Sequence, residues 1–227
     1  MNSKLITRYA IRETMGLTLM GMALFWSAGQ IDWWPAWASI AVMLGWSVAT
    51  AIVILRCHPA LLAERLGPRR GTKPWDMALM SGLGLAQLTR YIIAGLDHRY
   101  GWTGNYSLAA QLAALTICAL GYSLFVWATA SNPFFSQTVR IQSERGHRVA
   151  TGGPYRYVRH PGYLGATVFE LASPILLASW WCLIAGGVGA VLLILRTALE
   201  DRALQAELNG YDEYARQVRY RLLPGVW

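Results

Sequence analysis

Apolar residues gather into six long runs along this chain, separated by shorter polar stretches. The runs cover approximately residues 14–31, 36–55, 77–96, 108–130, 163–178 and 181–199. A bilayer span takes about 20 apolar residues, and within a bilayer a helix satisfies its own backbone polar groups. We therefore predict an all-α integral membrane bundle with about six transmembrane helices. The last two runs are joined by so few residues that they must form a tight helical hairpin.

The chain becomes polar after the sixth run, but apolar positions return there at steps of three or four. Such spacing is typical of an amphipathic helix that lies on an apolar surface. The sequence thus predicts one C-terminal amphipathic helix carrying Leu204, Leu208, Tyr211, Tyr214 and Val218.

Composition supports a membrane protein and excludes several other classes. Of the 227 residues, 55% are hydrophobic and 14% are charged, whereas soluble domains carry about 25% charged residues. This balance excludes an ordinary soluble globule and a disordered chain. The 3 cysteines lie far apart without metal-ligand spacing, so we predict neither a metal site nor a disulfide framework.

The basic residues follow an alternating pattern that indicates orientation. The net charge is +8, and every lysine and arginine except Arg90 and Arg99 falls in the N-terminus, the C-terminal end, or the second or fourth connection. Cytoplasmic loops carry such an excess. We expect a multi-pass protein, in the cytoplasmic (inner) membrane, with both termini cytoplasmic. Attraction to anionic membrane lipids accounts for the positive charge, so we expect membrane lipids and no nucleic acid as partners.

The fourth connection is unusually long and divides the chain into two parts. It begins at Asn132 and runs to Pro161, whereas packed helices are usually joined by about 2–8 residues. We expect residues 1–131 to form four N-terminal transmembrane helices and residues 132–227 to form the functional core. Because the hairpin returns the chain to its starting side, segments 152–163 and 200–224 should be neighbours. Their histidine, arginines, tyrosines and acids suit a polar cofactor, beside an apolar substrate on the lipid side.

The same two segments carry a resemblance to a known family. The run Gly-Pro-Tyr-Arg-Tyr-Val-Arg-His-Pro-Gly-Tyr-Leu-Gly at 153–165, the pair Glu200-Asp201 and the motif at 218–224 resemble the isoprenylcysteine carboxyl methyltransferase family. The family is related to the phospholipid N-methyltransferases. The resemblance covers roughly the last hundred residues. The family commonly has two glutamates where this chain has Glu200-Asp201.

This resemblance implies an S-adenosylmethionine-dependent membrane methyltransferase whose lipophilic substrate enters from the bilayer. It implies that the donor lies in a cytoplasmic pocket, and we expect that pocket to be formed by Gly153, Pro154, Tyr155, Arg159, His160, Pro161, Tyr163, Glu200, Asp201, Tyr211 and Tyr214. A planar guanidinium suits an acidic group, so Arg219 or Arg221 would orient the substrate or the donor carboxylate.

An acid inside the fifth run is a further catalytic candidate. Glu170 lies about two turns within that helix, where an ionised side chain is costly unless it has a partner. Arg90 in the third run either pairs with Glu170 or extends outward. An equally simple interpretation is that Glu170 is a structural acid facing the bundle interior.

Two other functions remain open from the sequence. The final helices also look similar to those of sterol reductases, which favours a membrane reductase using a nicotinamide cofactor as one alternative. A non-catalytic lipid-binding or transport protein is another. The acceptor is equally open: a prenylated cysteine carboxylate follows the family, but a lipid amine, a hydrophobic acid or a thiol fits the residues as well.

Overall fold

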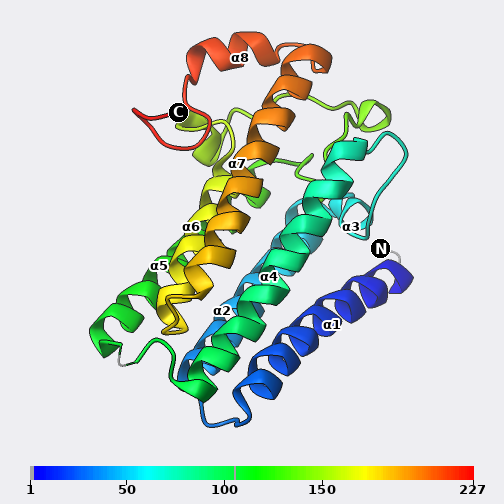
Figure 1. Ribbon diagram of the computed structural model, residues 1–227. Helices are drawn as coiled ribbons and strands as arrows, with labels where there is room; N and C mark the ends of the chain where they lie inside the picture. Colours follow the sequence, from blue (N-terminus) through cyan, green and yellow to red (C-terminus); the bar gives the residue numbers. More distant parts are fainter. Residues whose placement is uncertain (1–2, 105) are drawn as a thin grey trace.

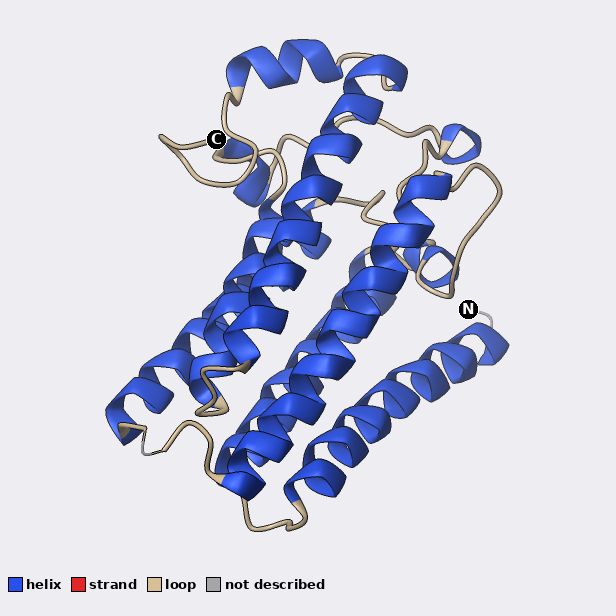
Figure 2. Cartoon of the chain, in the orientation of Figure 1, coloured by secondary structure: helices blue, strands red, loops and turns tan. Residues whose placement is uncertain are grey.

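The computed structural model describes residues 3–104 and 106–227, and within them the chain is helical without strands. The long helices lie side by side, and the short helices gather at one end of the bundle (Figures 1 and 2). The helices are α1 (Ser3–Ala28), α2 (Trp34–Cys57), α3 (Leu61–Glu64), α4 (Pro74–Tyr100), α5 (Leu108–Ser131), α6 (Pro161–Leu176), α7 (Cys182–Glu207) and α8 (Tyr211–Gln217). Two short 3-10 helices, η1 (Ser143–Arg145) and η2 (Gly153–Arg156), lie in the long connection.

The all-α membrane bundle predicted from the sequence is confirmed, with one refinement of the spans. The helices α2, α4, α5 and α7 are each long and apolar enough to cross a membrane. The helix α6 has 16 residues, which at about 1.5 Å per residue is shorter than the bilayer core. The helix α1 has 26 residues, but charged side chains occupy its first half. Both lie alongside the four spans.

Proline and glycine explain several helix boundaries. Proline stands at the first positions of α2, α4 and α6, where its missing N–H costs nothing and its fixed φ suits a helix. The helix α4 ends at Gly101, which has a φ of 67°, a left-handed conformation that glycine adopts readily. Pro161 thus has a local role, because it begins α6 directly after His160.

The helices α5 and α6 approach more closely than any side chain would allow. A Cβ added to Gly165 would lie 2.2 Å from the carbonyl oxygen of Gly121. Backbone therefore touches backbone at this point, and the two small residues set the distance between the helices. This contact fixes the start of α6, and with it the side chains that precede and follow Pro161.

The C-terminal amphipathic helix is divided in two, which corrects the prediction of a single helix. The helix α7 continues to Glu207, and the chain then turns at Gly210, whose φ is 82°. The short helix α8 follows. The predicted apolar face is nevertheless buried: Leu208, Tyr211 and Tyr214 form one cluster with Ala128 and Tyr155.

The long connection between α5 and α6 folds back across the end of the bundle. The N–H of Val139 donates to Asp76 at 2.8 Å, and Val139 accepts from the N–H of Lys73 at 3.0 Å. Arg140 forms two 3.0 Å hydrogen bonds with the buried carboxylate of Glu64. These bonds attach the connection to α3 and to the start of α4, so it forms a fixed roof over the helices.

Candidate active site

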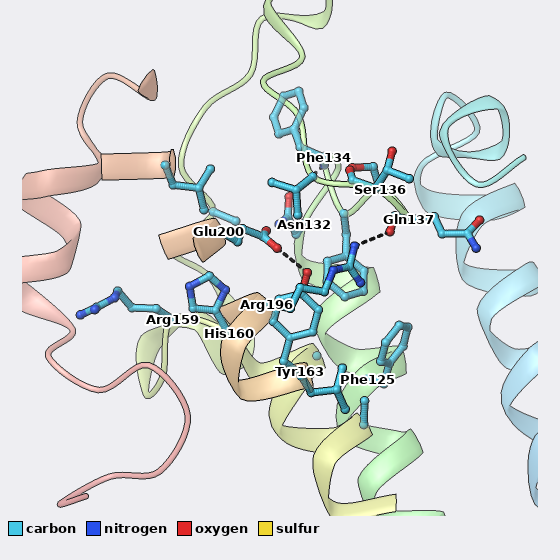
Figure 3. Close-up of a pocket in the computed structure, with 18 of the residues that line it drawn as sticks. Phe125, Asn132, Phe134, Ser136, Gln137, Arg159, His160, Tyr163, Arg196 and Glu200 are labelled. Atoms are coloured by element: carbon cyan, nitrogen blue, oxygen red, sulfur yellow. Dashed lines mark hydrogen bonds between the residues drawn. The ribbon is translucent and has the colours of Figure 1, made fainter. Parts of the chain in front are cut away.

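One cavity of about 360 Å³ lies beneath this roof and extends between the helices. Its walls come from α2, α4, α5, α6, α7 and α8, from Arg12 on α1, from Arg65 after α3, and from the connection after α5. Figure 3 shows side chains of this cavity from α5, from the connection after it, from α6 and from α7, with Glu200, Tyr163 and Arg196 close together. Segments far apart in the sequence therefore line one cavity.

The carboxylate of Asp201 joins the two segments that flank the helical hairpin. Asp201 is fully buried, and its oxygens accept hydrogen bonds from Arg159 at 2.8 and 2.9 Å and from Arg221 at 2.8 Å. The ring of His160 lies 3.2 Å from the same carboxylate, and the Tyr211 hydroxyl donates to it at 2.9 Å. The expectation that segments 152–163 and 200–224 are neighbours is confirmed.

Backbone bonds reinforce this junction. The N–H groups of Arg159 and His160 donate to the carbonyls of Tyr220 and Arg221, each at 2.9 Å. The Arg159 guanidinium also donates to the carbonyl of Val218 at 2.9 Å. The C-terminal tail is thus held against Arg159 and His160, directly before α6.

Glu200, next to Asp201 in sequence, faces the cavity instead. Its carboxylate accepts a hydrogen bond from the Tyr163 hydroxyl, and both residues line the cavity. The rings of His160 and Tyr163 are stacked with centroids 5.8 Å apart. Neighbouring positions on α7 therefore have different surroundings. Both carboxylate oxygens of Asp201 are hydrogen-bonded to other residues of the protein, whereas one oxygen of Glu200 has no hydrogen bond to a described residue.

Arg196 is a cavity residue that the sequence interpretation did not single out. It donates to the buried carboxylate of Asp76 at 2.7 and 3.2 Å and to the carbonyl of Gln137 at 2.7 Å. Its guanidinium also lies 5.1 Å from the centre of the Tyr163 ring. Because Arg196 precedes Glu200 by four residues, both lie on the same face of α7. That spacing was the signal available in the sequence.

Several pKa shifts describe the polar end of the cavity. Burial lowers the pKa of Arg159, whereas the hydrogen bonds and the negative charge of Asp201 raise it. The effect of Asp201 is larger, so the pKa of Arg159 is raised. Burial raises the pKa of Tyr155, Tyr211 and Tyr214, so these phenols stay neutral. Burial lowers the pKa of Arg65 to about 10 and that of His147 to about 4.

The structure brings together some of the predicted site residues and separates others. The residues lining the cavity are Tyr155, Arg159, His160, Tyr163, Glu170, Glu200, Tyr211 and Tyr214. The residues outside its lining are Gly153, Pro154, Pro161, Asp201, Arg219 and Arg221. Arg221 pairs with Asp201, and Arg219 is exposed. Neither of these arginines lines the cavity, whereas Arg196 does.

The lower part of the cavity lies among membrane helices. Glu170 lines it and forms an ion pair with the fully buried Arg90, which is one of the two arrangements that the sequence left open. Met43, Trp46 and Leu83 contribute apolar surface. The cavity therefore joins a polar upper region to a lower region that is apolar apart from a few polar groups.

Comparison with known proteins connects this geometry to a family of membrane enzymes. The family model described as "Isoprenylcysteine carboxyl methyltransferase (ICMT) family" matches residues 112–206. The solved structure of the eukaryotic intramembrane Ras methyltransferase ICMT has a TM-score of 0.57 to this chain, with 16% sequence identity, covering 94% of this chain and 75% of that one. The resemblance noted in the sequence is confirmed, and the fold is shared.

Curated relatives fall into two groups. A probable protein-S-isoprenylcysteine O-methyltransferase of Oryza sativa is 24% identical, over 76% of this chain and 92% of its own length. The Delta(14)-sterol reductase erg24 of Schizosaccharomyces pombe is 27% identical over 54% of this chain. The lamin-B receptor of Drosophila melanogaster is 32% identical over 56%. The chain spans 32% of that reductase and 18% of that receptor.

Proposed function

We propose that this chain, whose residues 112–206 match the model of the isoprenylcysteine carboxyl methyltransferase family, is a membrane methyltransferase. It transfers a methyl group from S-adenosylmethionine to a lipophilic acceptor. The observation that carries the proposal is the single cavity that joins Glu200 and His160 to apolar side chains of the membrane helices. A charged donor and a lipophilic acceptor need such a shared space.

The residues of the upper cavity fit the methyl donor. S-adenosylmethionine combines a sulfonium cation, an aromatic base and a zwitterionic amino acid, and it supplies an electrophilic methyl group. Glu200 provides a carboxylate beside the stacked rings of His160 and Tyr163, and a cation is stabilised by both kinds of group. Tyr155, Tyr211 and Tyr214 provide further aromatic surface. We assign cofactor binding to these six residues.

The other predicted residues have positioning roles in this proposal. Asp201 and Arg159 hold the C-terminal tail against His160. Gly153 and Pro154 begin η2, which carries Tyr155, and Pro161 begins α6, which carries Tyr163. Of these residues only Arg159 lines the cavity. The others hold in place the residues that do.

Arg196 is the residue we assign to the acceptor side. Its Nε and Nη2 atoms are bonded to Asp76 and Gln137, while Nη1 has no hydrogen bond to any residue in 3–104 or 106–227. A guanidinium held through two of its nitrogens presents the third to an acidic group. Fixing the acceptor in this way aligns it with the methyl group and keeps water out of the reaction.

The proposal includes the placement of the protein. The basic residues at the roofed end of the bundle support a cytoplasmic location for both termini and for the cavity mouth. Residues 132–227 then form the methyltransferase core and residues 1–131 the N-terminal helices, in a cytoplasmic membrane. A lipophilic acceptor would enter from the bilayer between the helices.

The decisive experiment measures donor preference and methyl transfer on the full chain in lipid nanodiscs. Calorimetry with S-adenosylmethionine and with NADPH should show binding of the first only. Incubation with methyl-labelled donor and a total membrane lipid extract should then label a lipid fraction. Binding of NADPH without S-adenosylmethionine would instead favour a reductase, the alternative that the sterol reductase relatives support. Binding of neither would favour a non-catalytic lipid-binding or transport protein.

A further inference from the structure

The lower end of the cavity contains an acid that the methyl-transfer proposal does not use. Glu170 follows Tyr163 by seven residues on α6, which corresponds to about 10 Å along the helix axis. Both residues line the same cavity. Polar chemistry therefore continues from the proposed reaction centre into the region where an acceptor's tail would lie.

The neighbouring helices are built around the carboxylate of Glu170. Its Oε2 atom accepts from Arg90, whose side chain is fully buried on α4. On α7, a Cβ added to Gly189 would lie 2.4 Å from the same oxygen, so a larger residue there would require the carboxylate to shift. The other oxygen, Oε1, has no hydrogen-bond partner among the described residues. Glu170 is 9% exposed, and the space it borders is the cavity.

A second acceptor lies in the same wall. Gln87, on α4, lines the cavity, and its amide nitrogen donates to the Tyr91 hydroxyl at 3.0 Å. Its carbonyl oxygen is bonded to nothing in the described chain. Tyr122 closes the opposite side, with its ring stacked on Trp46 at 4.9 Å. The lower cavity thus offers two unused acceptors beside a rigid aromatic wall.

We propose that the acceptor molecule carries a hydrogen-bond donor, a hydroxyl or an amine, about 10 Å from the atom that is methylated. That group binds Glu170 and Gln87. A plain hydrocarbon tail would displace solvent from both oxygens and leave them unsatisfied, which is unfavourable for buried acceptors. This inference rests on the proposed methyl transfer and narrows its substrate class to amphiphiles with a second polar group.

Matched probes test this directly. We would compare N-acetylcysteine thioethers that carry an unsubstituted octyl chain, the same chain with a hydroxyl on its third carbon, and the same chain with an amine there, which places the polar group about 10 Å from the carboxylate. For the wild-type protein, kcat/KM should be at least about tenfold higher for a polar-substituted probe than for octyl, because the bond to a charged acceptor is a strong one. The hydroxyl and amine probes show which donor is preferred. Equal rates, or a preference for octyl, would overturn the inference while leaving methyl transfer established.

Variants then assign the preference to its residues. Replacing Arg90 and Glu170 together by leucine removes the acid without leaving an unpaired buried charge, and the ratio between polar-substituted and octyl probes should fall to about one. Asp97→Asn is the control, since Asp97 is equally buried in a membrane helix but does not line the cavity. Its ratio should match wild type.

Two measurements keep the test independent of other failures. Should the double variant not fold, Gln87→Leu removes one acceptor alone and should reduce the ratio. Should no probe be methylated, the proposed function fails for these acceptors. Calorimetric affinities of the octyl and hydroxyl-substituted probes then decide the inference, with equal affinities counting against it.

Discussion

Arg159 and Asp201 form a two-point ion pair, with Nε and Nη2 of the arginine 2.8 and 2.9 Å from the two carboxylate oxygens. The pair is buried, and it connects the start of the His-Pro motif to α7. Breaking a buried pair from one side leaves an uncompensated charge, which costs about 3–5 kcal/mol.

Replacement of Asp201 by asparagine should therefore lower stability strongly. We expect Asp201→Asn to lower the free energy of unfolding by about 3 kcal/mol, since Arg159 and Arg221 lose their shared anion. Asp201→Glu restores the glutamate pair typical of the family but adds a methylene to a fully buried site, at about 1–3 kcal/mol. Thermal unfolding in detergent measures both. An unchanged melting temperature for Asp201→Asn would contradict the structural role given to this residue.

Glu200 should control donor affinity without controlling the fold. Glu200→Gln keeps the size and the bond to Tyr163 but removes the negative charge, so we expect affinity for S-adenosylmethionine to fall by at least about tenfold. The melting temperature should stay near wild type. Glu213→Gln, the same substitution at an exposed position on α8, is the matched control. Retained affinity in calorimetry of Glu200→Gln would remove Glu200 from the donor site.

Arg196 should act on the acceptor more than on the donor. Arg196→Lys keeps one positive charge but loses the planar edge held by Asp76 and Gln137. We expect kcat/KM for an acidic acceptor to fall roughly ten- to hundredfold because its alignment is lost. Donor affinity should change little. Arg202→Lys, exposed on the same helix, serves as the control. A loss confined to donor affinity would place Arg196 on the other side of the reaction.

The contact between α5 and α6 predicts a large steric effect. Gly165→Ala would bring a Cβ to 2.2 Å from the carbonyl oxygen of Gly121, so the helices must separate, at about 1–3 kcal/mol. Gly45→Ala, on the spanning helix α2, has no atom within 4 Å of the added Cβ and should be neutral or slightly stabilising. Equal melting temperatures for the two variants would show that the helices can relax at this contact.

The sequence predicts the bundle well because apolar runs and charge alternation are physical requirements of the bilayer. It also predicts that His160 lies near Glu200, since a helical hairpin must bring its two ends together. It does not distinguish Glu200 from Asp201: adjacent residues on a helix point about 100° apart, and only packing decides which one faces the cavity. The sequence does not mark Arg196 as a cavity residue, because an arginine near the end of a membrane helix is equally typical of the charge pattern that sets orientation.

The position of Arg221 shows the same limit from the other direction. A guanidinium in a motif suits an acidic ligand, but Asp201 already supplies that acid within the protein. Sequence alone contains both the charge and its partner without showing that they meet. The helix likewise breaks at Gly210, although the apolar spacing continues past this residue. The spacing shows which side chains are buried and does not show the backbone conformation.

His147 predicts a pH dependence of stability. Its ring is tilted against that of Phe134, with the centroids 4.7 Å apart, and accepts from the N–H of Gln142 at 3.2 Å. Burial, then the charges of Arg145 and Arg140, lower its pKa from 6.5 to about 4. Between these values the unfolded chain binds a proton that the folded chain does not, so stability should fall as the pH drops from 6.5 to about 4.

His147→Asn keeps an acceptor without a titrating group and should remove this part of the slope in melting temperatures recorded against pH. His58→Asn is the control, since His58 does not line the cavity. If His147→Asn and wild type lose stability in parallel across this range, His147 is not the group responsible.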